Sequence, residues 1–233
     1  MLRRAVFTAL TAIFVVSCAA EPEPVEPQTA EPQAAEPQAA EPQAPEWQTR
    51  VDESQSATDP DDTPDVEFTS MGAGGFQYVG GPAGTLWMPE QTASGDYTLS
   101  ATFTQNEPAS HTSYYGLVFG GSDLGEPTQR YLYFQVAQNG AFLIKERTGD
   151  DTVDLEGGSM EHMAVRVPPE GGSAVNELEV RVAGDTVTYV INGTEVHSNA
   201  RTDAFTITDG AVGARVNHVL NVTVSNFRVE VGG

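Results

Sequence analysis

Short segments in which apolar and polar side chains alternate fill most of the chain from about residue 66 onward. β-Branched and aromatic residues are frequent in them, and the alternation has the two-residue period of a β-strand. No segment carries a helical repeat long enough to connect parallel strands. The predicted strands are residues 97–105, 114–121, 131–136, 141–147, 163–167, 177–182, 186–191, 211–216 and 221–231.

Turn signals separate these segments, as expected where antiparallel strands follow one another. They are Asn139-Gly140, Gly184-Asp185, Asn192-Gly193 and Asp209-Gly210. A chain of about ten to twelve short strands without crossover helices buries its apolar faces most readily between two sheets. We therefore predict an all-β fold, an antiparallel β-sandwich.

The register of one predicted hairpin, in residues 131–147, follows from its apolar pattern. A two-residue turn would place Phe134 opposite Lys145, with a cation on the face that the core needs. A three-residue loop with Gly140 in the left-handed conformation pairs Phe134 with Ile144 instead. Because a shift of one residue moves every side chain to the other face, the apolar pattern favours the three-residue loop.

This register gathers tyrosines, cations and an amide on the opposite face of the hairpin. Flat rings can stack on a sugar, while cations and amides can hydrogen-bond its hydroxyls. The alternative is a set of cross-strand tyrosine and cation pairs that stabilise a solvated sheet. Trp87 would lie at the rim of this row or in the core. The candidate ligand-binding residues are Tyr131, Tyr133, Gln135, Lys145, Arg147 and, one strand earlier, Tyr114.

The N-terminus has the pattern of an export signal. A basic start is followed by an apolar run over residues 5–16 that is too short to span a bilayer as a helix. The motif Val15-Val16-Ser17-Cys18 then resembles the bacterial lipobox, which implies cleavage before Cys18 and its lipidation. Cys18 is the only cysteine, so an intramolecular disulfide is excluded. We expect an exported protein anchored in the lipid bilayer of the cell envelope; Ala19 favours the outer membrane, on its periplasmic or surface face.

A proline-rich spacer follows the expected anchor. Residues 26–45 repeat Glu-Pro-Gln with small residues, a composition that favours an extended chain over helix or sheet. Acidic polar residues continue to about residue 65. The expected domains are thus a signal peptide at 1–17, a disordered acidic spacer at 18–65 and a β-sandwich at 66–233.

The charge of the chain restricts its partners. The formal net charge is −22. An acidic surface lacks the basic footprint that nucleic acid requires, so nucleic acid is excluded as a partner. Neutral or cationic ligands stay open, neutral glycans among them.

Several of the predicted strands together resemble the concanavalin A-like lectin and glucanase jelly roll, and within it laminin-G-like domains and the bacterial 3-keto-disaccharide hydrolase-like family. The motifs that carry the resemblance are YYGLVFGG, YLYFQVAQNGAFLIKER, NELEVRVAGDTVTYVINGTEV, DGAVGARV and VSNFRV. The resemblance implies two curved sheets with a concave face that often binds carbohydrate. Glycan binding is thus the expected function. A glycoside hydrolase of the 3-keto-disaccharide type and an adhesion or structural module without catalysis are the alternatives.

No motif assigns a catalytic residue. Glu177 and Glu179 lie on one strand face, but the third acid of the glucanase pattern is missing and Arg181 follows, as on a charged solvent face. The four histidines lack the spacing of a zinc site. We expect no cofactor other than, as one alternative, calcium. The weak metal candidates are Asp150, Asp151 and Asp154, with Glu156 beside them.

Overall fold

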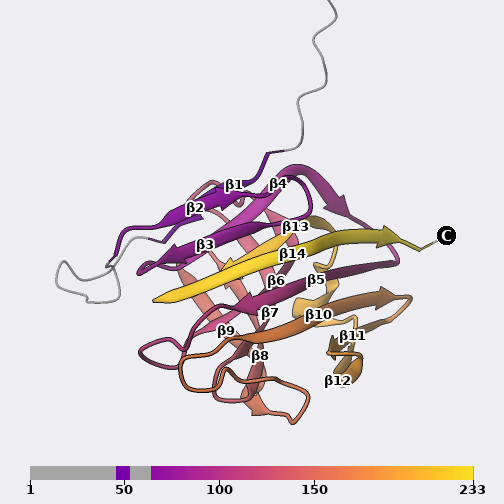
Figure 1. Cartoon of the computed structure of the whole chain (residues 1–233). Helices are drawn as coiled ribbons and strands as arrows, with labels where there is room; N and C mark the ends of the chain where they lie inside the picture. Colours follow the sequence, from indigo (N-terminus) through magenta and orange to yellow (C-terminus); the bar gives the residue numbers. More distant parts are fainter. Residues whose placement is uncertain (1–45, 53–63, 233) are drawn as a thin grey trace, which may run out of the picture. The chain divides into compact units, whose positions relative to one another are not determined.

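A computed structural model describes residues 46–52 and 64–232 of the chain. The signal peptide, Cys18 and most of the expected spacer lie outside these residues. The described part forms two seven-stranded sheets that lie face to face (Figure 1). Every strand pair is antiparallel. The predicted antiparallel β-sandwich is therefore confirmed.

The two sheets, called sheet A and sheet B below, bring together strands from distant parts of the chain. Sheet A has the spatial order β1 (Gln48–Val51), β4 (Gly84–Ala93), β13 (Gly210–Val216), β6 (Tyr114–Ser122), β7 (Arg130–Ala137), β8 (Ala141–Thr148) and β9 (Asp151–Glu161). Sheet B has the order β12 (Thr194–Ala200), β11 (Thr186–Ile191), β10 (Ala174–Ala183), β5 (Tyr97–Gln105), β14 (Leu220–Val231), β3 (Phe76–Gly80) and β2 (Glu67–Ser70). The one helix of the described residues is a 3₁₀ turn, η2 (Asp203–Thr206).

The core fills the space between the inner faces of the sheets. In β10, for example, every second side chain is buried and its neighbours face solvent, which is the alternation expected of a half-buried strand. Large aromatic side chains without solvent exposure, or with almost none, occupy the centre of the core. They include Phe76, Tyr78, Phe103, Tyr115, Phe119, Phe134, Phe142 and Tyr189.

Most inner strands lie where the sequence predicts them, whereas the strands at the sheet edges were not predicted. Residues 97–105 and 186–191 match β5 and β11 residue for residue. Residues 163–167 were predicted as a strand, which is wrong, because turn and coil structure occupies them. The four edge strands, β1, β9, β12 and β2, and the inner strands β3 and β4 were not predicted.

The sandwich begins earlier than the expected boundary at residue 66. β1 pairs with β4, and the Trp47 side chain beside it is 7% exposed. Its ring lies edge-on to Phe76 and Phe227 of sheet B, and its Nε1 donates a hydrogen bond to the Gly72 carbonyl oxygen over 2.9 Å. Residues 46–52 therefore belong to the domain. The sequence assigns them to the spacer because the residues on both sides of them are polar and acidic.

The tight turns use the residues that the sequence marks. Asn192 and Gly193, between β11 and β12, both have positive φ, at 50° and 78°. Positive φ at both central residues is what a type I′ hairpin turn requires. The Asn192 side chain also accepts a hydrogen bond from the Glu177 amide over 2.9 Å, which ties this turn to β10.

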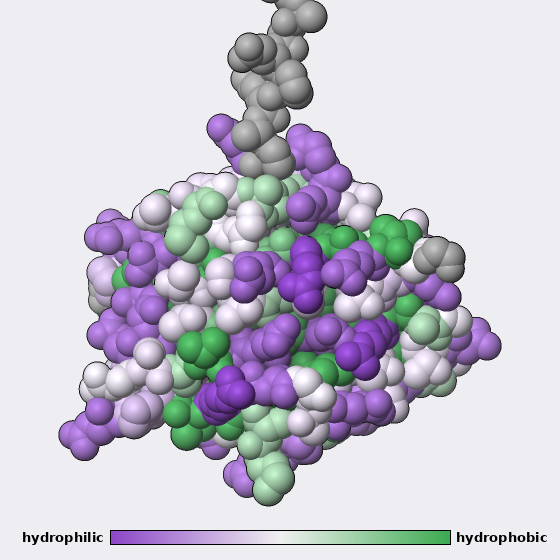
Figure 2. Space-filling view, turned by 45° about the vertical axis from the view of Figure 1, so that its right-hand side comes forward, coloured by the Kyte–Doolittle hydropathy of each residue, from purple (hydrophilic) through white to green (hydrophobic). Residues whose placement is uncertain are grey.

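The face of the domain in Figure 2 is mostly hydrophilic, and its apolar residues form small separate patches. Within residues 46–52 and 64–232, no helix has the length and hydropathy needed to cross a membrane.

Candidate functional site

The hairpin of β7 and β8 has the predicted register. Phe134 pairs with Ile144 and Tyr133 with Lys145. The loop has three residues, and Gly140 has a φ of 85° with its amide bonded to the Ala137 carbonyl over 3.1 Å. Tyr131 likewise pairs with Arg147, so the predicted row of side chains does lie on the face of sheet A that points away from the core.

The expectation that this row is exposed is wrong for most of its members. Tyr131 and Gln135 have no exposed surface, Tyr133 is 4% exposed and Arg147 is 7% exposed. A second apolar cluster encloses the tyrosines on this face of sheet A. Its other members are Trp87, Val118, Leu124 and Leu143. Rings enclosed in this way offer no flat surface to a sugar.

A buried ion network occupies the row beside the tyrosines. The Asp52 carboxylate, just after β1, lies 2.5 Å from Arg215 and 2.9 Å from Arg147. Arg215 also donates to the hydroxyls of Tyr131 and Thr85, each over 3.1 Å. The Tyr131 hydroxyl and the Arg147 guanidinium therefore already have hydrogen-bond partners within the protein.

The environment of the network shifts its pKa values. Burial alone would raise the pKa of the Asp52 carboxyl, but the charges and hydrogen bonds of Arg215 and Arg147 outweigh it and lower that pKa. Burial of Arg215 favours its neutral form, yet Tyr131 and Asp52 raise its pKa further above the ordinary range. Burial raises the pKa of Tyr133 to about 12. Each shift keeps the network in its paired state over the neutral range.

Two members of the row remain partly exposed. Tyr114 is half-buried, and its hydroxyl lies 2.8 Å from the Ser159 hydroxyl. Lys145 forms an ion pair of 2.8 Å with Asp154 of β9. Their side chains already have protein partners, and neither provides a free stacking surface.

The acids after the hairpin do not converge on one point. Asp154 pairs with Lys145, Asp150 lies 3.6 Å from Arg147, and Asp151 begins β9. Among the residues that the structure describes, no group of three or more His, Cys, Asp or Glu side chains is placed to hold a metal ion. The structure thus gives no support to a calcium site at these residues.

Glu177 and Glu179 lie on the outer face of sheet B. Glu179 forms an ion pair with Arg181 two residues along the strand, and Glu177 is exposed. Alternation along β10 places them on the side away from the core. This is the charged solvent face that the sequence indicates.

A pocket that the sequence does not predict opens between the edges of the two sheets. It has a volume of about 370 Å³. β9 of sheet A forms one wall, and β12 of sheet B with η2 forms the other. Its lining residues are Asp154, Leu155, Glu156, Asn199, Ala200, Thr202, Asp203, Ala204 and Phe205.

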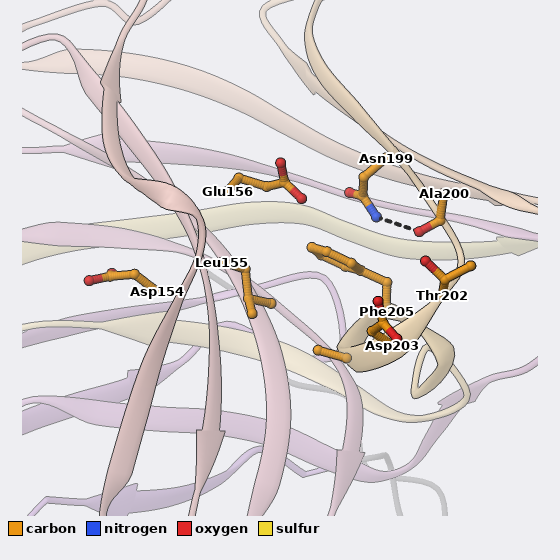
Figure 3. A pocket seen from close by; sticks show the side chains of 9 residues that line it. Asp154, Leu155, Glu156, Asn199, Ala200, Thr202, Asp203 and Phe205 are labelled. Carbon is orange, nitrogen blue, oxygen red and sulfur yellow. Dashed lines mark hydrogen bonds between the residues drawn. The ribbon is translucent and has the colours of Figure 1, made fainter.

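The polar groups of this pocket surround an aromatic ring. The Glu156 carboxylate and the Asn199 amide point toward each other near the Phe205 ring, whereas Asp154 points away (Figure 3). Asn199 donates from Nδ2 to the Ala200 carbonyl oxygen over 3.0 Å. Its Oδ1 is buried and has no hydrogen-bond partner among the described residues.

A bulge in β9 directs Glu156 into this position. Met160 pairs with Phe142 and Leu155 pairs with Ile144, so residues 156–159 bulge out opposite a single residue of β8. Glu156 has a φ of 58°, and the two glycines that follow also have positive φ. In a regular strand Glu156 would face away from the core-facing Leu155. Here its carboxylate comes within 3.2 Å of His197 Nε2 on the opposite sheet.

The floor beneath this contact is part of the core. The rings of Tyr189 and His197 lie 6.0 Å apart. Burial raises the pKa of Tyr189 well above its usual value, and the nearby Glu156 charge adds to the rise. The Tyr189 hydroxyl therefore stays protonated at neutral pH beside the Glu156 carboxylate.

One residue of the sequence, Phe205, indicates an apolar contact in this region. Phe205 is a lone aromatic residue in a polar stretch outside every predicted strand, and such a residue needs an apolar contact. The other lining residues come from polar edge strands, whose composition resembles that of loops.

Comparison with known proteins supports the fold and does not extend to a family. No family model matches the chain, and no curated protein matches its sequence. A solved structure of the carbohydrate binding module CBM66 from Bacillus subtilis is 12% identical, covers 81% of this chain and 97% of that chain, and has a TM-score of 0.57.

A protein of unknown function with a galectin-like fold, also from Bacillus subtilis, is similar to the same extent. It is 13% identical, covers 79% of this chain and 89% of that chain, and has a TM-score of 0.55. At these identities the likeness is one of fold. It agrees with the concanavalin A-like sandwich that the strand motifs resemble.

Proposed function

We propose that this chain is a glycan-binding protein of the bacterial cell envelope and that its ligand enters the pocket between β9, β12 and η2. The observation that carries the proposal is the pocket itself, in which hydrogen-bonding groups surround an aromatic ring. Its volume of about 370 Å³ falls in the range of small-molecule sites. The fold, shared with a carbohydrate binding module, is compatible with this role.

The chemistry of the pocket suits a saccharide residue. The C–H face of a sugar ring can pack on Leu155, which is half-buried, and on the exposed margin of the Phe205 ring, which is 8% exposed because most of it packs into the core. Hydroxyl groups can donate to Glu156 and to the unpartnered Asn199 Oδ1. A buried acceptor without a partner gains more from a ligand hydroxyl than a group already bonded in the protein.

The pocket is favoured over the predicted row on sheet A. Binding on Tyr131 or Tyr133 would first require removal of the cluster around them. Tyr114 and Lys145 are accessible, and they serve as the competing location in the test below.

Glycan binding is tested with a glycan array, followed by calorimetric titration of the strongest hit. Phe205→Leu keeps apolar contact but removes the flat ring, and Asn199→Ala removes the unpartnered acceptor. We expect each to weaken binding about tenfold or more, the equivalent of one or two hydrogen bonds or ring contacts. Both variants should keep the circular dichroism spectrum of the wild type.

Tyr114→Ala is the matched variant on the sheet face and should bind normally. Loss of binding in Tyr114→Ala with retention in Phe205→Leu would move the site to the row on sheet A. Absence of any glycan ligand would instead favour the structural or adhesion module, and turnover of oxidised disaccharides would favour the hydrolase alternative.

We also propose that lipidated Cys18 anchors the protein in the outer membrane. The support is the motif Val15-Val16-Ser17-Cys18 after an apolar run. More than one acyl chain makes anchoring stable where a single chain is marginal. Cys18→Ser should abolish labelling by radioactive palmitate and release the protein from the membrane fraction. Unchanged labelling would refute the anchor.

A further inference from the structure

The polar side-chain atoms that line the pocket between β9, β12 and η2 are mainly acceptors. Glu156 and Asp203 contribute carboxylates, and Asn199 contributes a buried Oδ1 without a partner among the described residues. The only hydroxyl in the lining is that of Thr202, which can donate or accept. The Asn199 amide nitrogen already donates to Ala200. A ligand that fits this set must supply donors.

The lining also carries uncompensated negative charge. It contains no Lys or Arg. Arg201, next to it in sequence, is engaged by Asp209 over 2.7 Å. Asp154 is neutralised by Lys145 and points away from the pocket. Within residues 46–52 and 64–232, no ion pair involves Asp203, and the partner of Glu156 is His197, which is charged only when protonated.

The two open carboxylates are held on unusual backbone. Asp203 has a φ of 52° and Glu156 a φ of 58°, so two of the six non-glycine residues with positive φ in the described chain are acids of this pocket. This conformation costs Glu156 about 1 to 2 kcal/mol, whereas an aspartate such as Asp203 adopts it more readily because its short side chain can hydrogen-bond locally. Such strain often marks residues whose side chains are re-aimed toward a ligand.

We infer that the pocket takes a saccharide residue that carries a protonated amino group, a hexosamine with a free amine. This inference rests on the proposed glycan binding and specifies its ligand class. An ammonium group has three donors and no acceptor, which matches the acceptor set and the negative charge. Leu155 and the exposed margin of the largely buried Phe205 ring provide the apolar surface for the sugar ring.

The test compares three short oligomers of equal length that share a backbone and differ at one ring substituent. Chitosan, chitin and cellulose oligomers carry an ammonium, an acetamido and a hydroxyl group there. We expect calorimetry at about pH 5.5, where most amines of the chitosan oligomer are protonated, to show this oligomer binding about tenfold or more tighter than the other two. Added salt should reduce this preference.

Matched variants separate the pocket from the general attraction between an acidic protein and a cation. Glu156→Gln and Asp203→Asn should each remove most of the preference for the chitosan oligomer. Glu161→Gln makes the same charge change at an exposed position on the same strand, and it should leave the preference intact. Equal losses in all three variants would overturn the inference, because the attraction would then be diffuse.

The remaining outcomes distinguish this inference from the proposed function. If chitin or cellulose oligomers bind as tightly as chitosan, and Phe205→Leu weakens that binding, the preference for an amine is wrong while glycan binding in the pocket stands. If Phe205→Leu changes the binding of none of the oligomers, both ideas fail.

Discussion

Asp52 joins two buried arginines of sheet A, Arg147 of β8 and Arg215 of β13. One of its carboxylate oxygens accepts hydrogen bonds from Arg215 and Arg147, whose side chains are both 8% exposed. Removal of one member of a buried ion group leaves the other charges without compensation. Because β1 ends just before Asp52, the same contact also fastens the N-terminal edge strand to sheet A.

Asp52→Ala should therefore destabilise the domain by about 3 to 5 kcal/mol. Chemical denaturation followed by tryptophan fluorescence measures this change. Asp150→Ala is the control, since that carboxylate is 80% exposed and lies 3.6 Å from Arg147. We expect the control to change stability by less than about 0.5 kcal/mol. Similar effects in the two variants would show that the network is not a stabilising contact.

The lowered pKa of Asp52 gives this contribution a pH dependence. A carboxyl whose folded pKa lies below its unfolded pKa stabilises the fold fully above the unfolded value, here about 3.9. The contribution is lost as the pH falls through the lower folded pKa. The stability difference between wild type and Asp52→Asn should thus be constant near neutrality and shrink below about pH 4. A difference that stays constant down to pH 2 would contradict the assigned shift.

At the residue scale, pairing was predictable and burial was not. The register of Tyr133 with Lys145 follows from local alternation, and the structure has it. The burial of the same tyrosine depends on Trp87 of β4, which is far away in the sequence, and on Leu124 of the loop between β6 and β7. The alternation of apolar and polar residues predicts which residues pair within a hairpin. The exposure of a side chain also depends on the other segments of the fold that cover the hairpin.

At the scale of elements, β1 defines where the domain starts. We expect a chain that begins at residue 46 to fold with the stability of the full protein, and one that begins at residue 66 to be much less stable. Trp47→Ala should cost about 3 to 5 kcal/mol, the usual range for a large buried aromatic side chain. Equal melting temperatures for the two truncations would show that β1 is dispensable.

The bulge in β9 predicts an opposition between stability and binding. Glu156→Gly removes the side chain from a position with positive φ, so stability should stay unchanged or rise by roughly 1 kcal/mol. Glycan binding should be lost in the same variant, because the carboxylate leaves the pocket. Thermal denaturation and titration measure the two effects. A clear loss of stability would mean that Glu156 supports the fold more than the site.

A matched pair of glycine substitutions checks the same bulge. Gly157→Ala meets no atom within 4 Å but imposes a φ of 81° on alanine, so it should destabilise by about 1 kcal/mol. Gly74→Ala also meets no atom, and Gly74 does not have positive φ, so its effect should be close to zero. Equal effects would show that the bulge is free to rearrange.

Edge strands explain which elements sequence patterns miss. An inner strand such as β5 is enclosed by neighbours on both sides, and its alternation of buried and open positions is clear. β9 and β12 each have a free edge, and most of their residues are exposed or half-buried. Polar residues on edges protect a sheet from pairing with other chains, so edge strands resemble loops in composition.

At the scale of the whole molecule, the candidate site lies where the two sheets separate. Its walls come from β9 of sheet A and from β12 with η2 of sheet B, which are more than 30 residues apart in sequence. A pocket assembled in this way leaves no compact motif. The fold class was thus predictable from alternation and turns, while the location of the pocket depended on how two polar edges meet.

The proposed function is tested most directly by a solution NMR titration of isotope-labelled protein with the oligomer that binds most tightly. The amide signals of residues 154–156 and 199–205 should shift first and saturate with the calorimetric affinity. Shifts confined to Tyr114, Lys145 and their neighbours on sheet A, with no change around Phe205, would contradict a binding site between β9, β12 and η2.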